Sequence, residues 1–163
     1  GKDVLFSVEG KEIELDRSVL DEIGEPVVHL LRNAVDHGLE SPAVREAAGK
    51  PRAGRLTLSA QRDRNAVVIT VQDDGRGIDR GRVLARALQL DLVPAGTERL
   101  DDDGLLKCIA HPGFTTSDRV TAVSGRGVGV DAVISRVRAL GGSVELQSRE
   151  GRGTTMALRL PVT

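Results

Sequence analysis

Strand-like segments occur in neighbouring pairs in this sequence, and helical stretches separate the pairs. Alternating apolar and polar residues, divided each time by a short turn, lie at 4–15, 54–74 and 143–162. A fold built from repeated parallel βαβ units would instead place a helix after every strand. The paired order therefore predicts an α+β fold, in which helices pack on one face of a mixed, mostly antiparallel sheet. The first pair is expected to form a hairpin that turns at Glu9 and Gly10.

Amphipathic stretches between the pairs predict the helices. A first helix is expected to begin at Asp16 and to be interrupted at Gly24, and Pro26 then suits the first turn of a second helix that ends at Gly38. Further helices are predicted at 41–49, 79–90, 105–110 and 130–142. The segment 113–129 has no clear period, and a loop of that length usually has a function or is mobile.

The composition limits what the chain can be. Its 163 residues suit one domain spanning 1–163, and because Phe is scarce and Trp and Tyr are absent, the core must come from Val, Leu, Ile and Ala. A net charge of −1 offers no basic surface for nucleic acid or an anionic membrane, and no apolar run is long enough to cross a bilayer. We therefore expect neither nucleic acid binding nor membrane insertion.

The start of the chain and its single cysteine indicate the cellular setting. Lys2 and Asp3 lead directly into a strand-like segment, unlike the start of a signal peptide. Cys108 has no second cysteine with which to form an internal disulfide, which fits a reducing cytoplasm. Because the chain begins with Gly1 rather than methionine, we expect a domain excised from a longer cytoplasmic protein.

The stretch "GEPVVHLLRNAVDHG" has two faces when drawn as a helix. The apolar face holds Val27, Leu30, Leu31 and Ala34. The second face holds His29, Asn33, Asp36 and His37. An ordinary solvated face is one interpretation, but such faces usually carry Lys and Glu. This row instead supplies hydrogen-bond donors, acceptors and possible metal ligands.

Three glycine-rich segments lie at the ends of predicted elements. They are "VQDDGRGID", "SGRGVGVD" and "EGRGTT". The last is by default a hairpin turn, whereas glycines before a helix, as in the second, let backbone amides approach phosphate oxygens. The second matches neither the Walker pattern, which ends in Gly-Lys-Ser/Thr, nor the Rossmann fingerprint.

Taken in order, five segments resemble the motifs of one family. "HLLRNAVDHG", "DDGRGID", "HPGFTT", "SGRGVGVD" and "GRGTT" are similar to the N, G1, F and G2 boxes and the terminal GxGT of the Bergerat ATP-binding fold. Gyrase-like ATPases, Hsp90 chaperones, MutL and histidine kinases share that fold, and the sequence most resembles CheA-type chemotaxis histidine kinases. The resemblance covers nearly the whole chain and implies a two-layer α/β sandwich with a mobile ATP lid. Ala110 and Val130 depart from the usual Phe and Met.

The resemblance implies roles for the polar face of the helix. Asn33 would bind a Mg²⁺ ion that bridges the phosphates, as an amide oxygen can do for an ion that keeps several waters. Hydrolysing members carry a glutamate where this chain has His29, so the resemblance favours phosphoryl transfer to a protein over hydrolysis. His37 would also point at the nucleotide.

The resemblance also implies which residues bind ATP. Asp73 would accept a hydrogen bond from the adenine amino group, Gly75 and Gly77 would let the backbone pass the base, and Thr154 would hold the adenine end. The residues implied at the phosphates are Gly125, Gly127 and Gly129. Arg82 and Arg126 could also steady the triphosphate, although an ordinary exposed arginine explains either one better when it is taken singly. Residues 113–124 would form the lid.

Partners follow from the resemblance as well. The phosphoryl acceptor would be a histidine-containing phosphotransfer domain of the same kinase. A response regulator, a receptor and a coupling protein would act through domains absent here, with this chain monomeric and the full kinase dimeric. Two alternatives remain: a Bergerat ATPase that hydrolyses ATP, against which His29 counts, and a pseudokinase that binds nucleotide or only partner proteins, against which Asn33 and Asp73 count.

Overall fold

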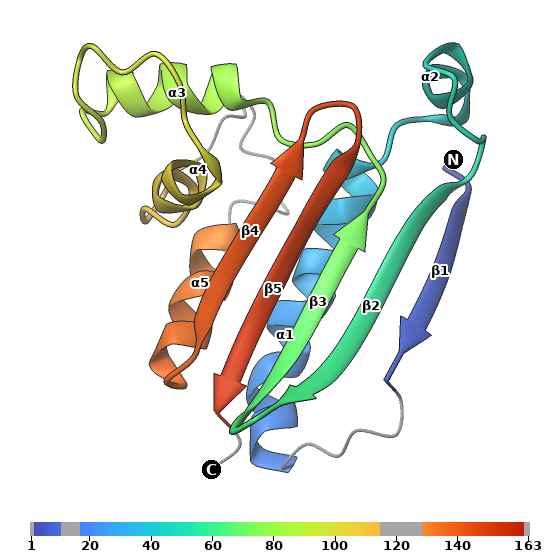
Figure 1. The fold of residues 1–163 in the computed structure, drawn as a ribbon, viewed down its shortest axis with the longest axis vertical. Coiled ribbons are helices and arrows are strands. Elements are labelled where there is room, and N and C mark those ends of the chain that lie inside the picture. Colours follow the sequence, from blue (N-terminus) through green and yellow to red (C-terminus); the bar gives the residue numbers. More distant parts are fainter. Residues whose placement is uncertain (1, 11–16, 115–128, 162–163) are drawn as a thin grey trace.

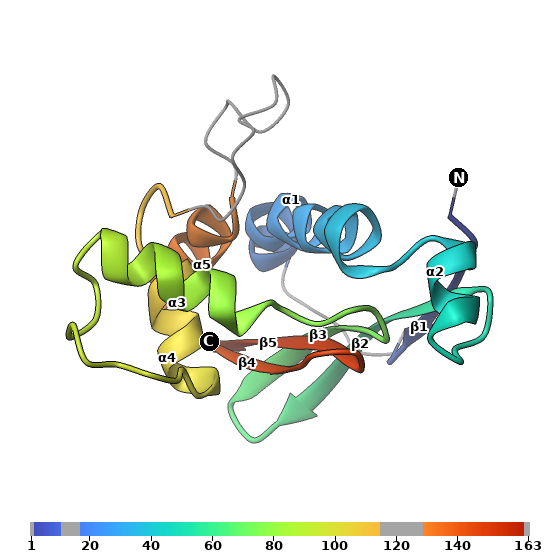
Figure 2. The same ribbon diagram turned by 90° about the horizontal axis from the view of Figure 1, so that it is seen from above.

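A five-stranded sheet forms one layer, and helices cover one of its faces (Figures 1 and 2). The computed structural model describes residues 2–10, 17–114 and 129–161. The strands are β1 (Val4–Glu9), β2 (Gly54–Asp63), β3 (Ala66–Asp73), β4 (Ser143–Arg149) and β5 (Gly153–Pro161), in the spatial order β1-β2-β3-β5-β4. The pairing of β1 with β2 is parallel and the other three pairings are antiparallel, which confirms the predicted mixed, mostly antiparallel α+β fold.

Two of the three predicted hairpins are present. β2 and β3 pair up to the turn at Arg64 and Asn65, and β4 and β5 pair up to the turn before Gly153. The expected partner of β1 at 11–15 lies outside the described residues, so that hairpin stays a prediction. β1 instead pairs in parallel with β2, with Val4 opposite Gly54, across a connection that contains helices, as parallel pairing requires.

The helices are α1 (Arg17–Asn33), a π-helix η1 (Ala34–Gly38), α2 (Pro42–Ala47), α3 (Arg80–Gln89), α4 (Asp102–Ile109) and α5 (Val130–Ala139). α1 runs without a break through Gly24 and Pro26, so the predicted interruption was wrong. Glycine and proline inside a helix cost about 1 and 3 kcal/mol. Burial of Ile23, Val27 and Leu30 on one face, at about 1.5–3 kcal/mol for each large side chain, outweighs that cost.

The core lies between the sheet and the helices packed on it, among them α1 and α5, which lie side by side on one face (Figure 2). Fully buried members come from both layers and include Ile23, Val133, Ile134, Val137, Leu158 and Leu160. They are Val, Leu and Ile, as expected for a chain almost without aromatic residues. Among the helices that the structure describes, none is long and apolar enough to cross a membrane.

Candidate functional site

Several segments that the sequence singled out meet at one end of the sheet (Figure 1). The C-terminal end of α1, the end of β3 and the beginning of β5 lie there, and the start of α5 approaches α1 from the side. Asp73 and Thr154 are direct neighbours across β3 and β5. The backbone N–H of Arg76 donates to the Gly38 carbonyl at 2.8 Å, which joins the end of η1 to the loop after β3.

The predicted division of the α1 faces is present. On the apolar face Val27, Leu30 and Ala34 are buried and Leu31 is half-buried. On the polar face His29 and Asn33 are half-buried, whereas Asp36 and His37 are exposed. Beyond Asn33 the chain forms a π-helix, with Leu39 N–H donating to the Ala34 carbonyl at 2.8 Å. The wider π turn changes the angular spacing of side chains. The regular row of polar side chains that was predicted to continue from His29 to His37 is therefore not maintained beyond Asn33.

His29 is the polar residue of this face whose electrostatics the packing changes most clearly. Its Nε2 atom is buried and has no hydrogen-bond partner among the described residues. Burial lowers the pKa of His29 below its usual value, the charge of Arg32 lowers it further, and Asp131 opposes both. The imidazole is therefore neutral at pH 7, with a nitrogen able to take up a proton.

Asp73 is a buried carboxylate at the end of β3, with only 9% of its surface exposed. Its Oδ1 accepts the Gly75 N–H at 2.9 Å. Burial raises the pKa of Asp73, although hydrogen bonds from the backbone of Gly75 and Thr154 oppose the rise. The carboxylate is thus held in place by the backbone of the loop that follows it and of β5.

The glycines after β3 are required by close backbone approaches. A Cβ on Gly75 would lie 2.0 Å from the Gly38 carbonyl oxygen. Gly77 has φ +74°, and a Cβ there would lie 2.2 Å from the Arg149 carbonyl oxygen. Packing against η1 and the β4–β5 turn therefore explains both glycines without a ligand, and their role beside adenine stays a prediction.

Ser148 is a residue of this region that sequence reasoning missed. It is 4% exposed, and its Oγ accepts the Ile78 N–H at 2.8 Å and lies 3.0 Å from the hydroxyl oxygen of Thr154. It thereby joins Thr154 to the loop after β3. The signal was available: β4 buries alternate residues, Val144, Leu146 and Ser148, and a serine at an inward position needs polar partners.

Replacing Ser148 tests this link. Ser148→Ala should lower the free energy of unfolding by about 1–3 kcal/mol, because the Ile78 N–H is left without its acceptor. Thermal or denaturant unfolding of the unliganded chain measures the loss. Ser135→Ala is the matched control, since Ser135 is exposed on α5. An equal effect of the two substitutions would contradict a specific role for the Ser148 hydroxyl.

Other predicted site residues are placed differently. Arg82 is exposed on α3, where its backbone N–H donates to Asp79 Oδ1 at 3.1 Å. Gly129 precedes the first turn of α5, and Asp131 in that turn accepts the Gly113 N–H at 3.2 Å. Gly125, Arg126 and Gly127 lie outside the described residues, as does the expected lid apart from Gly113 and Phe114.

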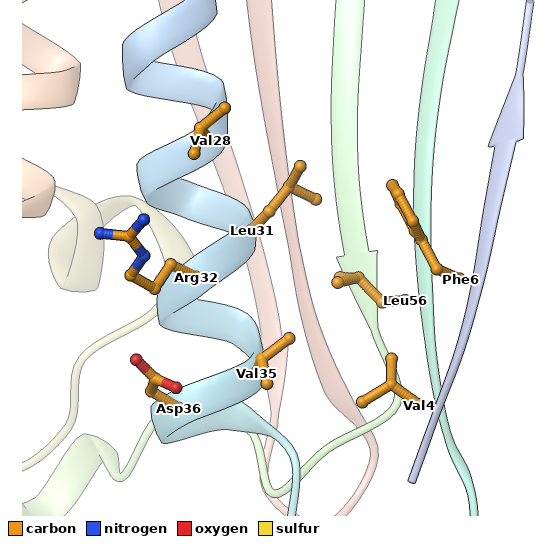
Figure 3. A pocket seen from close by; sticks show the side chains of 8 residues that line it. All are labelled: Val4, Phe6, Val28, Leu31, Arg32, Val35, Asp36 and Leu56. Carbon is orange, nitrogen blue, oxygen red and sulfur yellow. The ribbon is translucent and has the colours of Figure 1, made fainter. Parts of the chain in front are cut away.

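An apolar groove lies on the side of α1 that faces β1 and β2 (Figure 3). It has a volume of about 400 Å³ and is lined by Val4, Phe6, Val28, Leu31, Arg32, Val35, Asp36 and Leu56. None of the predicted ATP-binding residues lines it. In the parts of the chain that the structure describes, no group of three or more His, Cys, Asp or Glu residues could hold a metal ion.

Residues 20–163 match the family described as histidine kinase-, DNA gyrase B-, and HSP90-like ATPase. The chain belongs to this family, and membership of an ATPase family implies that it binds ATP. The architecture agrees: the chain resembles the histidine kinase domain of a blue-light activated kinase from Erythrobacter litoralis, with TM-score 0.58, 18% identity and coverage of 96% of this chain and 54% of that one. It also resembles the nucleotide-free catalytic domain of the histidine kinase ThkA, with TM-score 0.56, 17% identity and coverage of 98% and 80%.

Curated relatives show to which subgroup of this family the chain belongs. The chain is 52% identical to the chemotaxis protein CheA of Halobacterium salinarum and 44% identical to that of Bacillus subtilis, over 99% of its length in both cases. It is also 46% identical to the gliding motility regulatory protein of Myxococcus xanthus, again over 99%. Within the family it is a CheA-type ATPase domain of the histidine-kinase class. It spans only 24%, 24% and 21% of these relatives, so the domain is one part of each of them.

Proposed function

We propose that the chain binds Mg-ATP between the polar face of α1 and the start of α5, and passes the γ-phosphoryl group to a histidine of a separate phosphotransfer domain. The observation that carries the transfer step is His29. Its buried Nε2 has no described partner and its pKa is lowered, so it is a neutral base beside the proposed nucleotide site. A glutamate there would favour activation of water instead.

In the proposed mechanism, each residue has a separate task. The Asp73 carboxylate accepts a hydrogen bond from the adenine amino group, an interaction that guanine, with a carbonyl at that position, cannot make. Thr154, beside Asp73 in the sheet, supports the same end of the nucleotide. The glycine segment before α5 and the N-terminus of that helix favour the negative phosphates.

At the other end of ATP, the acceptor imidazole attacks the γ-phosphorus. A nitrogen–phosphorus bond forms, the bond from the γ-phosphorus to the bridging oxygen breaks, and ADP leaves with that oxygen's electron pair. His29 orients the incoming imidazole and takes its proton. The protein contributes mainly position and charge, because phosphoryl transfer requires little covalent chemistry from it.

Asn33 is the residue we propose for the metal ion. Its half-buried amide can provide one oxygen ligand, and a magnesium ion would take its other ligands from phosphate and water. This donor set fits a site without a cluster of carboxylates among the described residues. When bound, the ion would neutralise phosphate charge.

The names of the chemotaxis relatives support a role of the proposed reaction in signalling. A response regulator, a receptor and a coupling protein would then act through other parts of a longer, dimeric, cytoplasmic kinase, of which this chain would be the monomeric ATP-binding domain 1–163.

The test uses γ-labelled ATP, Mg²⁺ and the phosphotransfer domain of the same kinase. Label that is acid-labile and base-stable should appear on that domain, and Asn33→Ala should reduce it to background. The matched control is Asn65→Ala, which removes an exposed amide at the β2–β3 turn, at the other end of the sheet. Equal labelling with Asn33→Ala would contradict the metal role.

The two alternatives give different results in the same experiment. Steady phosphate release without acceptor would identify an ATPase. ATP binding without any label transfer, repeated with the full-length kinase so that no domain is missing, would identify a nucleotide-binding pseudokinase. Either outcome would overturn the proposed kinase function.

A further inference from the structure

Four charged side chains form a network beside the loop that follows β3. They are Glu40, which follows η1, Arg45 in α2, Lys50 after α2, and Asp74, the residue after the proposed adenine contact. Arg45 is 1% exposed and Glu40 is 7% exposed, so the network has a buried centre. Two cations face two carboxylates, and the charges balance.

Arg45 uses its whole guanidinium group in this network. Its Nε donates to the Pro51 carbonyl at 2.7 Å, and Nη1 donates to Glu40 Oε1 at 3.1 Å and to the Asp74 carbonyl at 3.2 Å. Its Nη2 donates to Asp74 Oδ2 at 3.1 Å. Arg45 therefore binds both the side chain and the main chain of Asp74.

Lys50 continues the contacts by one residue. Its Nζ donates to Glu40 Oε2 at 2.7 Å, to the Asp74 carbonyl at 3.1 Å and to the Gly75 carbonyl at 2.8 Å. Burial alone would raise the pKa of Glu40, but the hydrogen bond and charge of Lys50, the backbone and Arg45 together lower it. Glu40 is thus ionised at neutral pH and holds both cations.

Such a network is not explained by stability alone. A buried ion pair is often no more stabilising than apolar residues of similar volume, because its desolvation cost offsets the attraction. What the network provides is orientation, because charge-assisted hydrogen bonds are directional and hold the atoms that they join in defined positions. Here the atoms joined include the main-chain carbonyls of Asp74 and Gly75, directly after Asp73, and the Gly75 N–H in turn holds Asp73 Oδ1.

We propose that the network of Glu40, Arg45, Lys50 and Asp74 is a positioning device that sets the direction of the Asp73 carboxylate and so the selectivity for adenine. The proposal rests on the proposed function, because it assigns adenine recognition to Asp73. The network acts through the main chain and touches no nucleotide. Arg45 and Lys50 are therefore positioning residues.

Lys50→Met is the main test, because it removes the contacts to Asp74 and Gly75 while Arg45 still pairs with Glu40. The affinities for ATP and GTP, which differ only in the base, are measured for the chain and the variant. ATP affinity should fall by about 10- to 100-fold, on the order of losing one hydrogen bond to a charged group. GTP affinity should change little, so the selectivity ratio should fall.

Lys107→Met is the matched control, since Lys107 is 76% exposed and pairs with the exposed Asp103 on α4. It should leave the ratio unchanged. If Lys50→Met is folded and keeps the wild-type ratio, the positioning role is wrong. If the unsubstituted chain itself does not prefer ATP, the failure lies in the proposed function instead.

A second variant and a second measurement keep the proposal testable if Lys50→Met folds poorly. Arg45→Lys keeps the charge but loses the planar fork that reaches Pro51, Glu40 and Asp74 together. It should also lower the ATP-to-GTP selectivity. Without nucleotide, hydrogen exchange at the Gly75 amide should accelerate in both variants, but not in Lys107→Met. Unchanged exchange together with unchanged selectivity would overturn the proposal.

Discussion

Asp73→Asn is expected to weaken ATP binding by about 100-fold, the equivalent of one lost hydrogen bond to a charged group at about 1.5–3 kcal/mol. The geometry makes the amide a poor replacement. The carboxylate accepts hydrogen bonds from the backbone of Gly75 and Thr154, so the asparagine would keep its oxygen toward these donors and turn its NH₂ group toward the base. Two donors, this NH₂ and the adenine amino group, would then face each other. Guanine offers a carbonyl at that position, so preference for ATP over GTP should fall.

The same substitution should not destabilise the unliganded chain. Burial raises the pKa of Asp73, so the folded state disfavours its ionised form relative to the unfolded state. Stability from such a group is present below its unfolded pKa of about 3.9 and is lost as the pH rises through the folded value. Above the folded value that contribution is lost, and the neutral amide removes the cost of a buried charge, which offsets weaker backbone hydrogen bonds from Gly75 and Thr154.

Calorimetric titration with ATP and GTP, and thermal unfolding without ligand, measure the two effects. Asp63→Asn is a suitable control, because Asp63 lies at the far end of the β2–β3 hairpin and pairs with Arg159 on the surface. Unaltered ATP affinity in Asp73→Asn would remove Asp73 from the adenine site. A large loss of stability would instead assign it a structural role.

His29→Gln is expected to slow phosphoryl transfer by about 10²- to 10⁴-fold, the usual contribution of a general base. ATP affinity should change little, because glutamine keeps a similar polar volume at the half-buried position. Since burial and Arg32 lower the pKa of His29, the transfer rate should rise with pH, with the midpoint of the rise below pH about 6.5, the usual histidine value. The part of this rise that comes from His29 should be absent in the variant, whereas a rise from the acceptor imidazole should remain.

Single-turnover transfer to the phosphotransfer domain, measured across pH 5 to 8 at saturating ATP, separates this step from binding. His111→Gln is the control, because His111 is an exposed histidine after α4. If His29→Gln transfers at the wild-type rate, His29 is not the base. If ATP affinity falls as much as the rate, His29 acts in nucleotide binding.

Local elements were predictable wherever the interacting residues are close in the sequence. The pairs β2–β3 and β4–β5 follow from alternation around short turns, since the partners of each strand are neighbours in the chain. The parallel pairing of Val4 with Gly54 was not predictable, because helices separate the two strands in the sequence and no local pattern identifies the partner. The continuity of α1 through Gly24 and Pro26 was mispredicted because local propensity omits the burial of Ile23 and Val27.

For the site, the order of motifs predicted roles for Asn33, Asp73 and Thr154, which stay predictions, and the structure makes Asp73 and Thr154 neighbours. Ser148 and the network around Arg45 were not foreseen. Arg45 and Asp74 are far apart in the chain, and their contact depends on where α2 meets the loop after β3.

The sequence by itself determined the class of fold, the apolar and polar faces of α1 and the order of the family motifs, because each depends on residues a few positions apart. Only the tertiary structure decided the partner of β1, the lowered pKa of His29, the raised pKa of Asp73 and the burial of Arg45. The physical reason is that burial and charge pairing depend on which distant segments come into contact. Local sequence patterns contain no information about those contacts.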